Sequence, residues 1–159
     1  MPSPEARPAA GPEAFCIDLR VYYQDTDAGG VVYHANYLNF FERARTEWLR
    51  HLGYDLRAMA QAGHLFIVRR LELRFLRPAL LDDRLRVSVE VEHVGRAQLT
   101  LRQRACRDAQ DLVEASVNLA CVEGGSFRPT ALPGTLYAEL APSASTIRQN
   151  ERSKRGRHS

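Results

Sequence analysis

Apolar and polar residues follow two different periods along this chain. Between about Asn36 and His51 an apolar residue recurs every three or four positions, which predicts one long amphipathic helix. The apolar stripe of that helix consists of Tyr37, Phe41, Ala44, Trp48 and Leu52. Asn36 is the expected N-cap and Gly53 the expected C-terminal stop, and a short second helix is predicted over about 55–62.

Strands are predicted on both sides of this helical region. Residues 15–23 are expected to form the first strand, and after the helices apolar residues occupy every second position, as in strands. The later strands are expected at about 71–75, 85–91, 99–102 and 113–121. Most of the intervening turns are short, which implies antiparallel neighbours, and the apolar helix must bury its stripe against the sheet. The predicted fold class is therefore α+β, with a curved antiparallel five-stranded sheet wrapped around one long helix.

The two ends of the chain differ in composition from the middle. Residues 1–12 hold four prolines and predict a disordered lead-in, whereas residues 143–159 are rich in Ser, Arg and Lys and predict a basic disordered tail. Residues 13–142 are expected to form one domain without internal repeats. The length of 159 residues and the 45% hydrophobic content are ordinary for a single globular domain.

Neither a membrane span nor a signal peptide is expected. No run approaches the ~20 apolar residues that a membrane span requires. The first fifteen residues lack the basic start and the apolar run of a signal peptide. We therefore expect a cytoplasmic protein, with a peripheral position at the inner membrane as an open alternative.

The net charge of +3 is a property of the tail. Five basic residues against one acidic residue give segment 143–159 a charge of +4, which leaves −1 for the rest of the chain. A nearly neutral body argues against a nucleic-acid-binding domain. A basic tail can contact anionic lipid or RNA, but a solvated chain end is the more common case.

The three cysteines are Cys16, Cys106 and Cys121. Their number is odd, none shows CxxC spacing, and each falls in an apparent strand. This usage predicts small buried thiols in a reducing compartment, and it disfavours disulfides, zinc ligands and a cysteine nucleophile.

The segment YYQDTDAGGVVYHANY, residues 22–37, carries the densest candidate chemistry. It leads from the first strand through a glycine turn to the start of the helix. A carboxylate here faces exposed backbone N–H groups and the positive end of the helix dipole. An acid or base beside an oxyanion-stabilising amide is what acyl transfer requires. From the residues alone, His34 is either a capping residue or a proton carrier.

Two plainer interpretations apply to the aspartates of this segment. Asp25 and Asp27 followed by two glycines are similar to the start of a calcium loop. However, Gly29 and Asn36 fall at positions where such a loop needs ligand side chains, so a calcium site is disfavoured. Asp25 taken alone is more simply a turn or capping residue.

The sequence RVYYQDTDAGGVVYHANYLNFFERARTEWL resembles the opening of the hotdog-fold acyl-CoA thioesterases. It is most similar to the bacterial group associated with the Tol–Pal envelope system, within the 4-hydroxybenzoyl-CoA thioesterase superfamily. The similarity continues through FIVRRLELRFLRPALLDDRLRV and ALPGTLYAEL and covers residues 16–140. One departure is Gln24, which stands where an acidic residue is common in the family.

The resemblance implies a thioester hydrolase that converts acyl-CoA to a free carboxylic acid and CoA. It also implies homodimers or homotetramers with the active site at the dimer interface. Asp27 is the expected general base or nucleophile, Tyr23 and His34 complete the catalytic set, and the His34 backbone N–H would polarise the thioester carbonyl. Arg69 and Arg70 are candidates for binding the CoA phosphates, although a solvated strand face explains them more simply. No metal or cofactor is expected, since CoA is part of the substrate.

Two other functions stay open at this point. One is a hotdog hydratase that adds water to an enoyl thioester through an aspartate–histidine pair. The other is a scaffold or binding partner for acyl carrier protein and membrane lipid-synthesis enzymes, which the basic tail permits. The acyl chain preference is not predicted, because it depends on the depth of a pocket between protomers.

Overall fold

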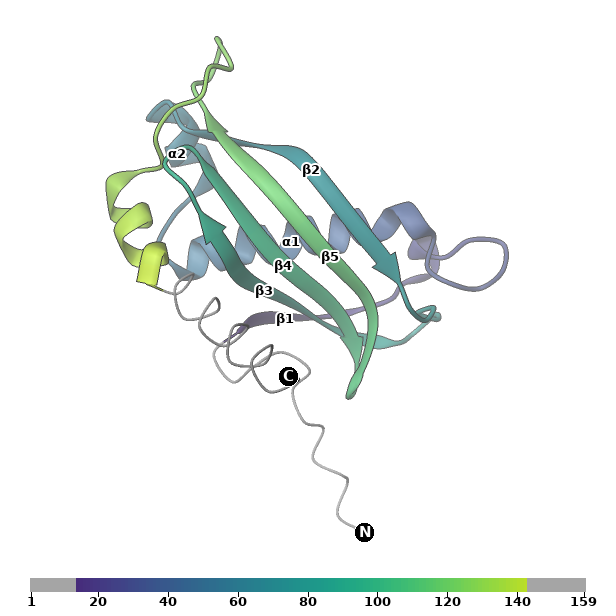
Figure 1. The fold of residues 1–159 in the computed structure, drawn as a ribbon. Helices are drawn as coiled ribbons and strands as arrows, with labels where there is room; N and C mark the ends of the chain where they lie inside the picture. Colours follow the sequence, from purple (N-terminus) through teal and green to yellow (C-terminus); the bar gives the residue numbers. More distant parts are fainter. Residues whose placement is uncertain (1–13, 143–159) are drawn as a thin grey trace, which may run out of the picture. The chain divides into compact units, whose positions relative to one another are not determined.

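The computed structural model describes residues 14–142. The predicted disordered segments 1–12 and 143–159 lie outside the described residues. The elements follow the predicted order along the chain (Figure 1). They are β1 (Phe15–Arg20), η1 (Tyr23–Asp25), η2 (His34–Asn36), α1 (Tyr37–His51), α2 (Leu56–Gln61), β2 (Leu65–Phe75), β3 (Arg84–Val94), β4 (Gln98–Arg107) and β5 (Gln110–Val122), where η marks a 3-10 helix.

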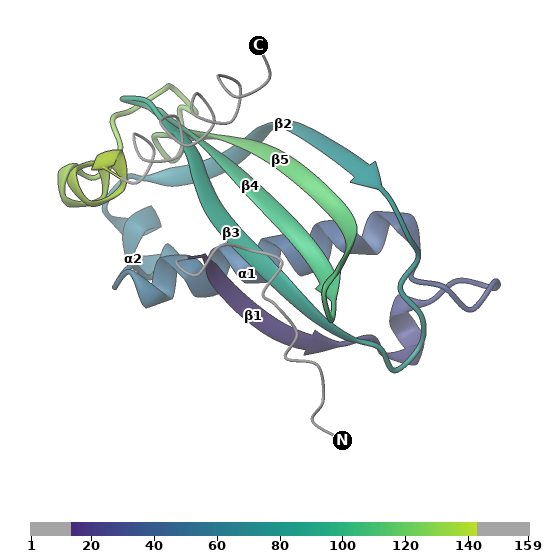
Figure 2. The same cartoon turned by 60° about the horizontal axis from the view of Figure 1, so that its bottom comes forward.

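The strands form one five-stranded sheet in the order β1-β3-β4-β5-β2. β1 lies beside β3 (Figure 2) and pairs antiparallel with it. The register runs from Phe15 opposite Val89 to Arg20 opposite Arg84. The predicted fold class, an antiparallel five-stranded sheet with one long helix, is confirmed. None of the helices within the described residues has the length and apolar character that crossing a membrane requires.

The described residues form two compact units, and the boundary between them passes through β2, β3, β4 and β5. The first unit contains the residues up to Tyr54 together with Glu72–Glu90 and Arg102–Ala115. The second contains Asp55–Leu71, Val91–Leu101 and the residues from Ser116 onward. The expected single domain over 13–142 stays a prediction.

Each unit has its own buried apolar residues. In the first unit these include Phe40, Phe41, Ala44, Leu85, Val87, Val89 and Val113. In the second they include Met59, Leu99, Leu101, Val117, Leu119 and Leu136. The candidate active-site segment, residues 22–36, lies wholly in the first unit.

α1 buries the predicted stripe. Its buried residues are Tyr37, Phe40, Phe41, Ala44, Trp48 and Leu49, and Leu52 at the C-cap is half-buried. Gly53 then adopts φ +92° and donates its N–H to the carbonyl of Arg50, so the predicted C-terminal stop is confirmed. The predicted N-cap role of Asn36 is wrong in one respect. Asn36 occupies the cap position, but its side chain makes no capping hydrogen bond.

Several strand limits differ from the prediction. β3 ends at Val94 and β4 at Arg107, both later than predicted. β1 ends at Arg20, because the chain turns into η1 directly afterwards. β2 begins at Leu65, well before the predicted residue 71. The early residues of β2 were missed because four apolar residues in succession, Leu65 to Val68, do not alternate with polar ones.

Candidate active site

Residues 22–36 connect β1 to α1 and carry all three residues predicted to act in catalysis. The connection doubles back on itself through backbone hydrogen bonds. The Asp27 N–H donates to the Val31 carbonyl at 2.9 Å, and the Tyr33 N–H donates to the Asp25 carbonyl at 2.9 Å. The connection is therefore a hydrogen-bonded loop that runs from η1 through η2 to the start of α1.

Asp25 links the two ends of this loop. Its side chain is only 6% exposed. One carboxylate oxygen accepts the Tyr22 N–H at 2.8 Å, and the other accepts the side-chain amide of Asn36 at 2.7 Å. Asn36 in turn accepts a hydrogen bond from the Asn39 side chain. Asp25 thus has the turn-and-cap role that its position suggested, and Asn36 serves as its partner.

Asp27 has a different environment two residues later. Its side chain is exposed, and Oδ1 accepts the Gly29 N–H at 2.8 Å. The Gly30 N–H donates to the Asp27 carbonyl at 3.0 Å, which closes a tight turn. Gly30 has φ +77°, and a Cβ on Gly29 would lie 3.2 Å from Asp27 Oδ1. The two glycines therefore permit both the turn and the close approach of backbone to carboxylate.

His34 and Tyr23 are also exposed. His34 is the first residue of η2, and its ring packs on Tyr33 with a centroid distance of 4.7 Å. Tyr23, at the start of η1, is 83% exposed. Within residues 14–142, no hydrogen bond joins the side chains of Tyr23, Asp27 and His34 to one another. The structure thus brings these residues into one loop without joining them into a hydrogen-bonded set.

Arg69 and Arg70 lie on β2, and both side chains are exposed. They belong to the second compact unit, whereas Asp27 belongs to the first. Their assignment to CoA phosphates stays a prediction.

The loop between β2 and β3, which the sequence did not indicate as part of the site, contacts the end of the connection. The Val32 N–H donates to the Ala79 carbonyl at 2.9 Å, and the Ala79 N–H donates to the Tyr37 hydroxyl at 3.1 Å. Burial raises the pKa of Tyr37, so this hydroxyl stays neutral near pH 7. One signal was available, because a tyrosine on a buried helix stripe needs a partner for its hydroxyl.

The cysteines lie in strands, as predicted, and stay protonated near neutral pH. Burial raises the pKa of Cys16 and of Cys121, and burial together with a hydrogen bond to Asp111 raises the pKa of Cys106 to about 12. Among residues 14–142, no three His, Cys, Asp or Glu side chains are grouped as a metal site would need.

Both a sequence profile and individual relatives match this chain to thioesterases. The sequence profile of the thioesterase-like superfamily matches residues 21–140. An acyl-CoA thioesterase YbgC from Haemophilus influenzae is 47% identical over 125 residues, which cover 78% of this chain and 92% of that protein. An acyl-CoA thioester hydrolase YbgC from Escherichia coli is 43% identical over 123 residues, covering 77% of this chain and 92% of that protein.

Solved structures agree with the sequence matches. A probable thioesterase from Bartonella henselae superposes with a TM-score of 0.72 at 35% identity, and the match covers 76% of this chain and 99% of that one. A hypothetical protein from Aquifex aeolicus gives a TM-score of 0.75 at 26% identity, covering 79% and 98%. Because the profile spans most of the chain and the relatives match over nearly their whole length, this chain belongs to the thioesterase-like superfamily and has its hotdog fold.

Proposed function

We propose that this chain hydrolyses acyl-CoA thioesters to a free carboxylic acid and CoA, with Asp27 as the reacting carboxylate. The reaction type is supported by membership of the thioesterase-like superfamily and by relatives at 43–47% identity that are named as acyl-CoA hydrolases. The chain is accordingly a thioester hydrolase.

The contrast between Asp25 and Asp27 supports the choice of residue. Both oxygens of the buried Asp25 carboxylate already accept hydrogen bonds from Tyr22 and Asn36. The Asp27 carboxylate is exposed, and a turn amide fixes its Oδ1. Asp27 is therefore the carboxylate of this loop that a substrate can reach.

Asp27 can act in two ways, and each consumes one water per thioester. As a general base it takes a proton from a water molecule while the water oxygen attacks the carbonyl carbon. The carbon–sulfur bond then breaks, and the CoA thiolate leaves and is protonated. As a nucleophile its carboxylate attacks the carbonyl and expels the thiolate, forming an anhydride that water hydrolyses.

Both routes place negative charge on the carbonyl oxygen. We assign the stabilising contact to the backbone N–H of His34, the first residue of η2. N–H groups in the first turn of a helix lack acceptors within the helix and can donate to such an oxygen. His34 and Tyr23 complete the proposed catalytic set through their exposed side chains.

The proposal extends to assembly and location. The enzyme is a homodimer or homotetramer with the site at the interface between protomers, and Arg69 and Arg70 contact the CoA phosphates. It acts in the cytoplasm, with acyl carrier protein, the inner-membrane surface and the Tol–Pal system as further partners to test. No resident metal or cofactor takes part in the proposed chemistry.

Steady-state thiol release from a panel of short, long and aromatic acyl-CoAs tests the proposal. Asp27→Asn keeps the side-chain shape but cannot serve as a carboxylate, so kcat should fall at least about a hundredfold. Thermal melting and acyl-CoA binding should stay near wild type. His34→Ala should lose less activity, because the backbone N–H survives. Near-wild-type kcat in folded Asp27→Asn protein would refute the assignment.

The matched variant Asp25→Asn distinguishes a residue that stabilises the loop from one that takes part in the reaction. It should lower the melting temperature more than Asp27→Asn, because it weakens hydrogen bonds that a buried carboxylate accepts. Saturated acyl-CoAs in the panel also exclude the hydratase, since that reaction needs a double bond. Binding without thiol release by the wild type would favour the scaffold function.

A further inference from the structure

Loop 78–83, between β2 and β3, is bonded to the chain just before the connection 22–36 begins. The Val21 N–H donates to the Asp83 carbonyl at 2.9 Å, and the Asp82 N–H donates to the Val21 carbonyl at 3.0 Å. This pair of bonds fixes the point at which the chain leaves β1 and enters the connection.

The same loop is bonded to the other end of the connection. Val31 forms an isolated antiparallel bridge with Leu80, and the Val32 N–H donates to the Ala79 carbonyl at 2.9 Å. The Tyr37 hydroxyl accepts the Ala79 N–H at 3.1 Å, which ties the loop to the first residue of α1. Loop 78–83 therefore holds both ends of the segment that carries the candidate catalytic residues.

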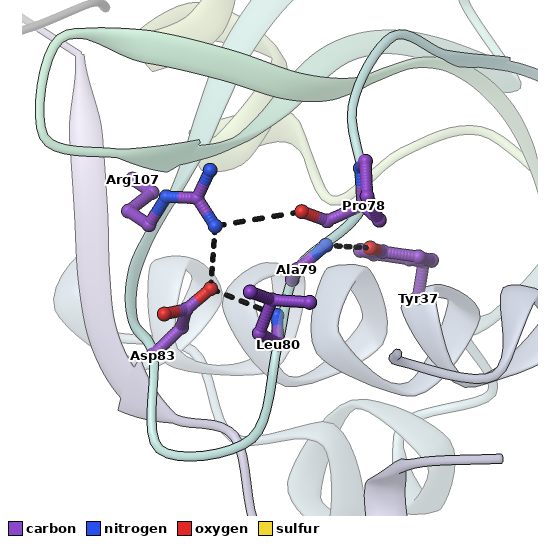
Figure 3. Close-up of polar contacts among 6 residues, drawn as sticks. All are labelled: Tyr37, Pro78, Ala79, Leu80, Asp83 and Arg107. Atoms are coloured by element: carbon purple, nitrogen blue, oxygen red, sulfur yellow. Dashed lines mark hydrogen bonds and ion pairs between the residues drawn. The ribbon is translucent and has the colours of Figure 1, made fainter. Parts of the chain in front are cut away.

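An ion pair fixes the loop itself. Arg107 Nη1 lies 2.6 Å from Asp83 Oδ2 and also donates to the Pro78 carbonyl at 3.4 Å (Figure 3). The same Asp83 oxygen accepts the Leu80 N–H at 2.8 Å. The Asp83 side chain is 19% exposed and the Arg107 side chain 28% exposed, so water screens this pair less than a surface pair. Asp83 and Arg107 thus join the start, the middle and the end of the loop to β4.

We propose that Asp83 and Arg107 are positioning residues for Asp27. They fix loop 78–83, and the loop fixes both ends of the connection 22–36, on which Asp27 is held. This inference rests on the proposed function, since it assigns a purpose to the geometry of that site. We assign Asp83 a positioning role because its Oδ2 is already bonded to the Leu80 N–H and the Arg107 guanidinium.

A second ion pair in the same unit supplies a matched control. Arg86 on β3 and Asp18 on β1 approach to 3.4 Å, but their side chains are 51% and 79% exposed. Neither residue belongs to loop 78–83 or to the connection. Asp18→Asn therefore makes the same chemical change as Asp83→Asn at a pair that positions no catalytic group.

The first measurement is thiol release. Displacing a reacting group by about 1 Å can cost a hundredfold in rate, so Asp83→Asn should lower kcat by about 10- to 100-fold. KM should change less than about threefold, because the substitution touches no substrate contact. Arg107→Lys keeps the positive charge beside Asp83, so its kcat should fall less than that of Asp83→Asn. Asp18→Asn should keep wild-type kcat and KM.

A double mutant separates positioning from general damage. If Asp83 acts through Asp27, then adding Asp83→Asn to an Asp27→Asn background should cost less than about twofold further in kcat. A merely structural loss would instead multiply with the loss caused by Asp27→Asn. Full multiplication of the two effects would overturn the proposal, as would wild-type kcat in Asp83→Asn.

Hydrogen exchange followed by mass spectrometry tests the positioning role of Asp83 without an activity measurement. In Asp83→Asn, peptides covering 22–36 should exchange at least about fivefold faster, because local opening becomes easier. Asp18→Asn should leave their exchange at the wild-type rate. If Asp83→Asn unfolds, Arg107→Lys is measured in the same way. Should the wild type release no thiol, the proposed function fails, while unchanged exchange over 22–36 overturns the positioning role.

Discussion

At the scale of single residues, the surroundings of two neighbouring aspartates separate their roles. Asp25 is buried and bonded through both oxygens, whereas Asp27 is exposed on a glycine turn. The sequence favoured Asp27 through family resemblance and Asp25 as a cap through its position before a turn. It could not show that Asn36, eleven residues later, would be the partner of Asp25. That pairing depends on the chain folding back, which no local pattern encodes.

Gly30 offers a test of the turn that presents Asp27. Its φ of +77° is left-handed, and a Cβ there would meet nothing within 4 Å, so substitution adds backbone strain without a clash. Gly30→Ala should lower the free energy of unfolding by about 1–2 kcal/mol. It should also lower kcat, because relief of the strain moves Asp27.

Urea unfolding and thiol release measure the two effects of Gly30→Ala. Gly134→Ala is the control, since that glycine also has open space but lacks a left-handed φ. It should leave stability unchanged or slightly raised. Equal stability losses at the two positions would contradict the strain argument.

Cys106 offers a test that depends on pH. Burial and the Asp111 hydrogen bond raise its pKa from 9.0 to about 12. Between these values the folded chain keeps a proton that the unfolded chain loses, so the contribution of Cys106 to stability falls as the pH rises from about 9 to 12. At pH 8 the thiol is protonated and should react slowly with iodoacetamide in folded protein and readily in urea. Mass spectrometry of the labelled peptide measures both rates, and rapid labelling in the folded state would count against this environment.

At the scale of elements, a buried glutamine on β4 is hydrogen-bonded to α1. Gln103 on β4 is fully buried, donates to the Phe41 carbonyl at 3.0 Å and accepts from the Arg45 guanidinium at 2.9 Å. The Arg45 guanidinium is partly removed from water, and this burial lowers its pKa. The helical pattern predicted the apolar stripe but not that an arginine beside it would turn inward.

Gln103→Leu should lower the free energy of unfolding by about 1–3 kcal/mol, because Arg45 loses a buried acceptor. Leucine has a similar volume, so little of the loss should come from packing. Gln110→Leu at the exposed start of β5 is the control and should stay within about 0.5 kcal/mol of wild type. Urea unfolding compares the two, and a neutral Gln103→Leu would show that the contact contributes nothing.

The elements also show where periodicity fails as a guide. It located α1, β3 and β5 because one face of each is buried and the other is not. It missed the first half of β2, where residues 65–70 lack alternation and are half-buried or exposed. It also missed loop 78–83, whose contacts to Val32 and Arg107 join residues far apart in sequence. Hydrogen bonds and ion pairs of this kind are tertiary contacts, so they follow from the fold and not from a local sequence pattern.

At the scale of the whole molecule, the sheet leaves two edge strands, β1 and β2. β1 has only six residues, and so short an edge discourages pairing with another chain. β2 has eleven residues and exposes Ile67, Val68 and Phe75. A long edge with exposed apolar side chains is the kind that pairs with a second copy, so β2 is the edge at which we expect protomers to meet.

Val68→Lys tests that expectation, because Val68 is 50% exposed on β2. The wild type should sediment at micromolar concentration without a dominant monomer. Val68→Lys should shift the distribution toward monomer, since a charge at a pairing edge must be desolvated for the strands to associate. If the active site lies between protomers, kcat should fall in step with the loss of the oligomer.

Leu56→Lys, at a 42% exposed position on α2, is the control and should change neither the sedimentation distribution nor kcat. A wild type that sediments as a monomer would remove both the edge pairing and the interfacial site, whereas a monomeric Val68→Lys with full activity would leave the pairing and place the whole site within one chain.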